Sequence, residues 1–388
     1  MSIFLILMIS LVIGVYGLAN FYIGLRLWQS LGSFIPFLHP AVYWTVLSIV
    51  ALSFIFGRFT SRIMPKKLIE LFSVISAYWM GAMTYFILID FLIDLIMLIG
   101  RSMKLIPSRE ILNIWNQPIM GVSVVLIVGA IFIYGYFNAK NPVIKNYNIS
   151  IPKETPVLET LHIVMVSDIH LGRIVRKDRL LKLVEIVNGQ QPDIIIFAGD
   201  IIDEDVEPYI DQNMAEEFKR LESKYGVYMA LGNHEYIGSQ HDDIAIQLQQ
   251  ANVGILRDTC VKLADSFCLV GREDIESKRF TGKDRKPLKD ILKDTDTSLP
   301  IIVIDHNPSK LKEAVEAGVD LQLSGHTHAG QMFPNQWITR LMYENHWGYL
   351  KKGNFQVIVS SGFGTWGAPI RTGNSPEVVD VTVNFKKS

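Results

Sequence analysis

Long apolar runs fill the first third of the chain. Four runs with few charged residues stand out at residues 3–25, 40–57, 71–99 and 118–137. Each is near or above the roughly 18 to 20 residues that a helix needs to cross the hydrocarbon core of a bilayer. The pattern therefore predicts an all-α membrane domain of about four transmembrane helices over residues 1–140, and hence a multi-pass protein of the cell membrane.

The third run is long for one crossing and short for two, so we expect one tilted helix. Asp90 and Asp94 are four residues apart on one face of this helix. A carboxylate inside a membrane is by default a candidate functional group. The alternative is that both residues lie where the helix leaves the bilayer.

Basic residues in short loops favour the cytoplasmic side of a membrane. With the N-terminus inside, the cytoplasmic loops would hold Arg58, Arg62, Lys66, Lys67, Lys140 and Lys145, and the outer loops Arg26, Arg101, Lys104 and Arg109. This small excess predicts a cytoplasmic C-terminal domain, but one missed or extra span would reverse the orientation.

From about residue 155 the pattern changes to short β-rich runs that alternate with amphipathic stretches. This alternation is typical of a layered α/β domain, here over residues 157–388. The segment NPVIKNYNISIPKETP (141–156) is polar and holds three prolines, which predicts a linker. Strands are expected at 161–167, 194–199, 226–231, 254–263, 267–271, 300–305, 319–324, 355–360 and 377–385. Helices are expected at 176–188, 211–223, 240–250 and 308–317.

Charge is divided unequally between the two halves. Of 37 basic and 38 acidic residues, residues 1–139 hold only 12, which leaves 63 for the remaining chain and gives that part a net charge of −5. No basic stripe strong enough to bind a phosphate backbone is expected, so we predict no nucleic-acid partner. The balanced charged run at 272–290 predicts an exposed, mobile loop.

Two cysteines, Cys260 and Cys268, are too few for a disulfide-stapled scaffold or a thiolate zinc site. They flank a predicted hairpin, where free thiols are favoured over a disulfide. Any metal must therefore bind to His, Asp, Glu or Asn.

Polar residues of the metal-ligand type follow five of the predicted strands. The motifs are LHIVMVSDIH with Asp168 and His170, IIIFAGD with Asp200, VYMALGNHE with Asn233 and His234, IIVIDH with His306, and VDLQLSGHTH with His326 and His328. The carboxyl ends of strands in an α/β sheet form ligand crevices. A single motif of this kind occurs often by chance, whereas five in succession predict a metal site.

Residue type and spacing narrow the choice of metal. Residues two apart on an extended segment point to the same side, so Asp168 and His170 can bind one ion. A glycine one or two positions before Asp200, Asn233 and His326 allows a sharp turn at the strand end. Carboxylate oxygens combined with imidazoles suit Mn, Fe or Zn.

The ordered set DIH, GDIID, GNHE, DHNP and GHTH resembles the calcineurin-like metallophosphoesterase superfamily over residues 161–385. The stretch GHTHAGQ, with the later SGFGTW and Arg371, is further similar to a bacterial membrane-anchored branch. The resemblance implies a four-layer α/β/β/α sandwich with two mixed sheets and a centre of two divalent metal ions.

The resemblance also implies roles for individual residues. One ion would be held by Asp168, His170, Asp200 and His328, and the other by Asp200, Asn233, His306 and His326. His234 would be the catalytic acid, with Asp203 and Glu235 in supporting positions. Two ions would activate a hydroxide for in-line attack on phosphorus, so the implied enzyme hydrolyses a phosphoester or pyrophosphate bond.

The sequence indicates the substrate less clearly than it indicates the reaction. Residues 332–350 are rich in aromatic and aliphatic side chains, which could accept an acyl chain, lie on the membrane surface or pack on the domain itself. Arg371 and Arg340 are candidate contacts to a second phosphate. A lipid-linked or envelope substrate is favoured, and UDP-diacylglucosamine is one candidate implied by the resemblance.

Three alternatives stay open. Two are other hydrolases, a phosphoprotein phosphatase and a nucleotide phosphodiesterase. The third is a non-catalytic, metal-bound sensing module on a membrane scaffold, against which the full ligand set and His234 argue, since a module without turnover would be free to lose some of them.

Overall fold

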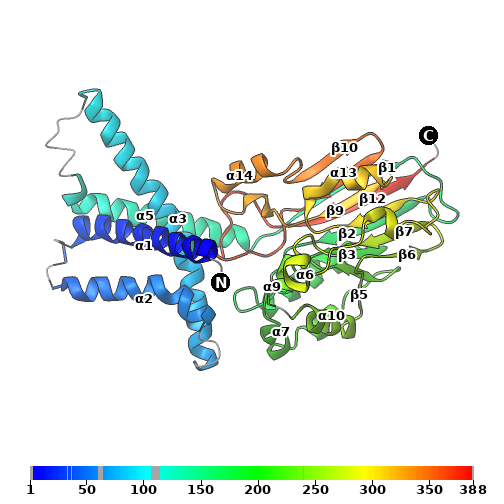
Figure 1. The fold of residues 1–388 in the computed structure, drawn as a ribbon, viewed down its shortest axis with the longest axis horizontal. Coiled ribbons are helices and arrows are strands. Elements are labelled where there is room, and N and C mark those ends of the chain that lie inside the picture. The colour runs from blue at the N-terminus through cyan, green and yellow to red at the C-terminus, as the bar shows by residue number, and fades with distance from the viewer. Residues whose placement is uncertain are drawn as a thin grey trace. The chain divides into compact units, whose positions relative to one another are not determined.

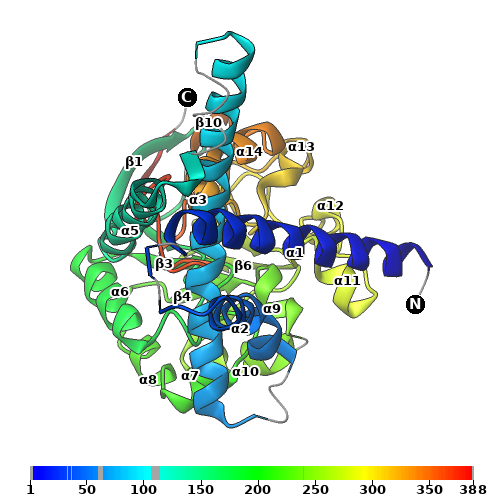
Figure 2. The same cartoon turned by 90° about the vertical axis from the view of Figure 1, so that its left-hand side faces the viewer.

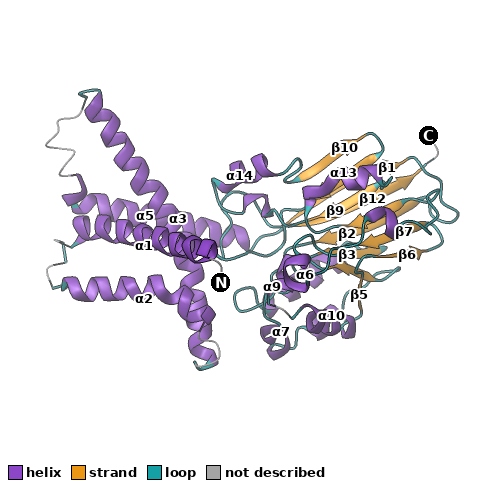
Figure 3. Cartoon of the chain, in the orientation of Figure 1, coloured by secondary structure: helices purple, strands orange, loops and turns teal. Residues whose placement is uncertain are grey.

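The computed structural model describes residues 3–32, 34–35, 37–59, 64–105, 114–238 and 240–386. The chain divides into two compact units: one comprises residues 1–135 with 367–369, the other residues 136–366 with 370–388. Figure 3 shows that the first is helical and that all strands belong to the second. Arg62 and Arg109, used above to predict orientation, lie outside the described residues, as does the side chain of Arg58.

The first unit contains long apolar helices. They are α1 (Ile3–Leu31), α2 (Pro40–Phe59), α3 (Lys66–Ser102) and α5 (Pro118–Ala139), with a short 3₁₀ turn η1 (Ile114–Asn116) before α5. All four α-helices are long and apolar enough to span a membrane, as the sequence predicts. Figure 2 shows α1 crossing α3 at a steep angle.

The two carboxylates of α3 have different surroundings. Asp94 accepts hydrogen bonds from the Tyr22 hydroxyl and the Trp115 indole, and it forms an ion pair with Arg26 at 2.5 Å. Asp90 is fully buried, and its carboxylate has no hydrogen-bond partner among the described residues. Arg26 is therefore paired inside the helical unit instead of being a free loop charge.

The second unit is built on two mixed six-stranded sheets (Figure 1). In spatial order, the first sheet contains β1 (Val143–Ile151), β12 (Glu377–Phe385), β2 (Thr160–Val166), β3 (Ile194–Ala198), β4 (Val227–Ala230) and β5 (Val253–Ile255). The second contains β10 (Gly348–Lys352), β11 (Phe355–Val359), β9 (Leu321–Ser324), β8 (Ile301–Ile304), β7 (Phe267–Gly271) and β6 (Thr259–Leu263).

Helices cover the outer faces of both sheets. The first sheet is associated with α6 (Lys177–Gly189), α7 (Glu207–Asp211), α8 (Ala215–Phe218), α9 (Asn233–Ile237) and α10 (His241–Gln250). The second packs against α12 (Leu288–Ile291) and α13 (Leu311–Glu316). The other short elements are α11 (Ser277–Thr281), which contacts α9, and η2 (Pro308–Lys310), η3 (His328–Gly330) and α14 (Asn335–Met342).

Three apolar cores separate the four layers. Alternate residues of each strand face opposite sides, so Ile163 of β2 enters the core between the sheets while Val164 packs beneath α6 and α10. A third core joins the second sheet to α12 and α13. The four-layer α/β/β/α architecture implied by the resemblance is confirmed.

Two edge strands and one helix differ from the sequence-based expectations. Residues 143–151, expected to be a linker, form β1, which pairs in parallel with β12. The alternation of Tyr147, Ile149 and Ile151 toward the core is the period-two signal that the flanking prolines obscured. Strand β10 was also not expected, and the helix expected over 211–223 is replaced by the short helices α7 and α8.

Candidate metal centre

Every predicted ligand lies at the carboxyl end of a strand. In the first sheet, β2, β3 and β4 run parallel and are followed by Asp168 and His170, by Asp200, and by Asn233. In the second sheet, the parallel strands β8 and β9 are followed by His306 and by the His326–His328 pair. Parallel strands end at one edge, so each sheet delivers its ligands to the same place.

One group of side chains gathers around His170. Its Nε2 lies 3.0 Å from Nε2 of His328, which is itself 3.5 Å from Oδ1 of Asp168. Oδ2 of Asp200 is 3.9 Å from the His170 Nε2. Two imidazole nitrogens and two carboxylates thus converge, and this is the donor set proposed for the first ion.

A second group surrounds His306. Its Nε2 is 3.1 Å from Asp200 Oδ2 and 3.2 Å from Asn233 Oδ1. The Nδ1 of His326 lies 2.9 Å from the same Asn233 oxygen. Asp200 is therefore close to both groups, as a bridging carboxylate requires. The donor types fit hard or borderline divalent cations such as Mn, Fe or Zn.

The backbone of the ligand loops is strained. Asp168, His170, Asp200, His326 and His328 all have φ between 48° and 72°. This left-handed region is uncommon for residues with a side chain, and such strain clusters at functional sites where the surrounding fold enforces it. Five of the seven proposed ligands share this feature.

The glycines near the ligands serve two purposes. Gly199, before Asp200, has a φ of +81° and makes the sharp turn that the sequence predicts. Gly232 and Gly325 are needed for space, because a Cβ at these positions would lie 2.2 Å from Asp200 Oδ1 and 2.3 Å from Asp168 Oδ2. A side chain at either glycine would displace a ligand.

Buried hydrogen bonds orient the ligands. Nδ1 of His306 lies 2.7 Å from the carbonyl oxygen of Ala198, to which it donates when its Nε2 faces Asp200. Glu235 accepts from four backbone N–H groups, those of Asp200, Ile201, Ile202 and Gly232, at 2.7–3.1 Å. Glu235 therefore fixes the loop that carries Asp200.

The electrostatic environment favours metal ligation by two of the histidines. Burial lowers the pKa of His326 to about 3 and holds the pKa of His328 well below its usual range. Both rings are therefore neutral at physiological pH, with a lone pair available for an ion. Although burial opposes it, the neighbouring His306 and His234 hold the pKa of Asp200 well below its usual range, so this carboxylate is ionised.

His234 begins the short helix α9 beside the ligands. Its Nδ1 donates to Asp203 Oδ1 at 2.9 Å, and its ring lies edge-on to the ring of His170 with centroids 4.6 Å apart. Burial alone would lower its pKa, but Asp200 and Asp203 raise the pKa of His234 to about 9. The ring therefore carries a proton at neutral pH that it can donate.

The two arginines predicted to contact a second phosphate have different surroundings. Arg371 is completely buried and donates to the carbonyl oxygens of Gly362 and Gly364 and to Asn374 Oδ1. The guanidinium supports the backbone around the site, and its contact with a substrate stays a prediction. Arg340 is exposed on α14, with its Nε 3.3 Å from His346.

Two aromatic residues lie beside the site: Trp366, which was not predicted to have a role there, and Tyr343, which belongs to the segment 332–350, for which contact with an acyl chain is one of the expectations. The Trp366 ring lies 5.9 Å from the His234 ring, and the Tyr343 ring 6.0 Å from the His326 ring. Trp366 ends the SGFGTW motif, which was a signal in the sequence. Its side chain is 57% exposed.

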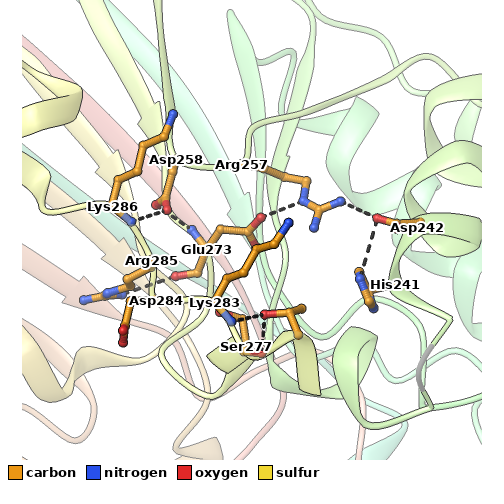
Figure 4. Close-up of a pocket in the computed structure, with 11 residues that line it drawn as sticks. His241, Asp242, Arg257, Asp258, Glu273, Ser277, Lys283, Asp284, Arg285 and Lys286 are labelled. Atoms are coloured by element: carbon orange, nitrogen blue, oxygen red, sulfur yellow. Dashed lines mark hydrogen bonds and ion pairs between the residues drawn. The ribbon is translucent and has the colours of Figure 1, made fainter. Parts of the chain in front are cut away.

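A separate pocket of about 570 Å³ lies along the charged run 272–290. Figure 4 shows Arg257 between Asp242 and Glu273, with Arg285 donating to the Glu273 carbonyl. The expectation of an exposed loop fits residues 282–284 of this run, which are exposed, but not Arg272 and Asp274, which are buried. Both Cys260 and Cys268 are free thiols.

A family model described as calcineurin-like phosphoesterase matches residues 161–330. An uncharacterized metallophosphoesterase of Aquifex aeolicus is 34% identical over 241 residues, which is 61% of this chain and 88% of the relative. The chain belongs to the calcineurin-like metallophosphoesterase family, and it is a metal-dependent phosphoester hydrolase of that family.

A relative from Danio rerio, named a transmembrane protein with metallophosphoesterase domain, is 30% identical over 274 residues; the match covers 68% of this chain and 62% of the relative. The name of this relative thus pairs a transmembrane protein with a metallophosphoesterase domain. Solved structures that are similar include a Thermus thermophilus 5'-nucleotidase precursor, with 16% identity, a TM-score of 0.37, and coverage of 58% of this chain and 54% of that one.

Proposed function

We propose that the chain is a membrane-anchored hydrolase that uses two divalent metal ions to cleave a phosphoester or pyrophosphate bond of a lipid-linked substrate. The observation that carries the proposal is the convergence of Asp168, His170 and His328 on one side of Asp200, and of Asn233, His306 and His326 on the other. When bound, the two ions supply an activated water and neutralise charge on the phosphoryl oxygens.

The chain's own residues complete the chemistry. His234, held by Asp203, is placed to donate its proton to the leaving oxygen. Asp200 lies between the two groups of ligands, and its carboxylate fixes their positions relative to each other. No Ser or Cys nucleophile is needed, and Cys268 is buried in β7.

The lipid-linked class of substrate is supported by the membrane helices. An enzyme held at a bilayer meets lipid-borne phosphoesters at a high local concentration, because the search is confined to a surface. UDP-diacylglucosamine is one such compound, and the panel below includes it beside soluble compounds.

The test is hydrolysis by the detergent-solubilised full-length protein with Mn²⁺. The panel contains an aryl phosphomonoester, an aryl phosphodiester, UDP-diacylglucosamine and a phosphopeptide. Asn233→Ala should abolish turnover by removing a ligand, while Asn148→Ala, a matched change on the exposed side of β1, should not. Preference for the lipid compound would support the proposal, and preference for the phosphopeptide would overturn the substrate class.

A further inference from the structure

Helix α14 exposes its apolar side chains, unlike most helices on the surface of a soluble domain. Trp337, Ile338, Leu341 and Met342 occupy one face about 140° wide. They are 59%, 56%, 89% and 67% exposed, and α14 has no buried residue. An amphipathic helix normally buries its apolar face, so this one presents its apolar side outward.

The polar face of α14 is the side that contacts the domain. The Thr339 hydroxyl lies 3.2 Å from Nδ1 of His346, and Arg340 contacts the same ring. The carbonyl oxygen of His346 accepts a hydrogen bond from Thr327, within the GHTH motif. These contacts fix the rotation of α14, so the outward apolar face does not result from a loosely held helix.

Two further aromatic side chains extend the apolar face at its start. Phe333, 45% exposed, packs against Trp337 with ring centroids 5.3 Å apart. Trp366 is tied to the same segment, because Gln331 exchanges two hydrogen bonds with its backbone. We call Phe333, Trp337, Ile338, Leu341, Met342 and Trp366 the apolar face of α14.

The end of the last membrane helix is bonded to the loop 370–375, which is bonded in turn to the segment before α14. Asn138, in the final turn of α5, donates to the carbonyl oxygens of Arg371 and Asn374. In that loop Thr372 donates its N–H to the Gln331 carbonyl and accepts from the Phe333 N–H. A single short loop therefore connects the exit of a membrane-spanning helix to the apolar face.

We infer that the apolar face of α14 lies in the interfacial layer of the bilayer that α5 spans. The bilayer is the occupant because the end of α5 and the start of α14 share one hydrogen-bonded loop, and because exposed Trp, Phe and Leu on a short amphipathic helix are the composition of an interfacial anchor. This membrane contact is inferred from α14 and its contacts and does not depend on the proposed function.

The consequence for catalysis rests on the proposed function. Asn374 donates to the carbonyl oxygens of His328 and Ala329, and Tyr343 at the end of α14 contacts the His326 ring. The loop with two proposed metal ligands is therefore bonded to Asn374, which also accepts a hydrogen bond from Asn138 near the end of α5, and the His326 ring lies against Tyr343, the residue that follows α14. This arrangement holds the metal centre beside lipid headgroups, where a lipid-borne phosphate is found.

The test measures immersion of α14 without using turnover. The full chain carries Leu341→Cys with an environment-sensitive NBD label, in a background where Cys260 and Cys268 are replaced by Ser, and it is reconstituted in phosphatidylcholine–phosphatidylglycerol nanodiscs. Lys312→Cys, on α13 with a side chain 88% exposed, is the matched control. Retained aryl phosphoester hydrolysis in each labelled chain shows that it is folded.

Doxyl-labelled lipid should quench the label at position 341 by about half and leave that at position 312 unchanged, whereas aqueous iodide should do the reverse. Iodide quenching at position 341 equal to that at 312, without lipid quenching, would overturn the inference. Protection from both quenchers would also overturn it and indicate a protein partner. Immersion with no hydrolysis of any lipid substrate would instead count against the proposed function.

Discussion

His234 joins a charged imidazole to a centre in which burial keeps His326 and His328 neutral. Its proton is held by Asp203 and lies beside the ligands instead of among them. A general acid matters most when the leaving group is poor, because a good leaving group departs without a proton.

We therefore expect His234→Ala to reduce kcat by about 10²-fold or more for an alkyl phosphoester and much less for a p-nitrophenyl ester. Steady-state kinetics with the two esters measure the difference. His162→Ala, which removes a histidine paired with Asp380 away from the ligands, is the control. An equal loss on both esters would assign His234 a role other than proton donation.

Gly232 illustrates how a residue without a side chain can govern metal binding. Gly232→Ala would place a methyl group 2.2 Å from the bridging carboxylate of Asp200. We expect the affinity for Mn²⁺ to fall by about 10- to 100-fold, as when other supports of a ligand are lost. Isothermal titration with Mn²⁺ measures it.

The matched change is Gly189→Ala, at the end of α6, where an added Cβ meets nothing within 4 Å. Its Mn²⁺ affinity should equal that of the parent chain, and stability should rise slightly because alanine loses less backbone entropy in a helix. Equal affinities for both variants would contradict the space argument at Gly232.

At the scale of elements, strand β1 belongs to the hydrolase unit and carries part of its core. Ile151 is fully buried in the core between the sheets, whereas Ile144 on the same strand is 40% exposed. Ile151→Ala should destabilise the unit by about 2–4 kcal/mol and Ile144→Ala by less than about 1 kcal/mol. Thermal unfolding of the detergent-solubilised protein compares them, and equal midpoints would show that β1 is not part of the cooperative core.

The outward face of α14 leads to a prediction about substrates. Leu341→Glu places a charge among the exposed apolar side chains and should reduce hydrolysis of a vesicle-borne lipid phosphoester by about tenfold, because burying a charge in the interface is unfavourable. Hydrolysis of a soluble aryl phosphodiester should be unchanged. Ile246→Glu, at a 49% exposed position on α10, is the control. A loss on both substrates would indicate a folding defect.

Some secondary-structure elements could be predicted from the sequence pattern and others could not. Buried central strands such as β2 and β3 are continuous apolar runs that end in a ligand, so both the strands and the site could be predicted. Edge strands β1 and β10 bury one side only, so their mixed polar and apolar composition does not distinguish them from connecting segments. The burial of Arg371 could not be predicted, because its partners are the carbonyl groups of Gly362 and Gly364 in an irregular loop, which no periodic pattern marks.

At the scale of the molecule, ion binding and stability of the hydrolase unit should be linked. An ion at a concentration 100 times its Kd stabilises the native state by about 2.7 kcal/mol. Chelation with EDTA should therefore lower the midpoint of thermal unfolding of the strand-rich unit, with a smaller effect in Asn233→Ala, which already lacks one proposed ligand. Circular dichroism at a wavelength dominated by strands follows the transition. A midpoint insensitive to EDTA would mean that no ion is bound tightly.

The distribution of ligands between the two sheets has a consequence for the order of folding. Asp168, Asp200 and Asn233 follow strands of one sheet, while His306 and His326 follow strands of the other. Because the loops also hold left-handed backbone conformations that their residues do not favour alone, neither sheet by itself presents a finished set of ligands. Assembly of the proposed ligand set is thus a late event in the life of the newly made chain, because a nascent chain that ends before β8 still lacks His306, His326 and His328.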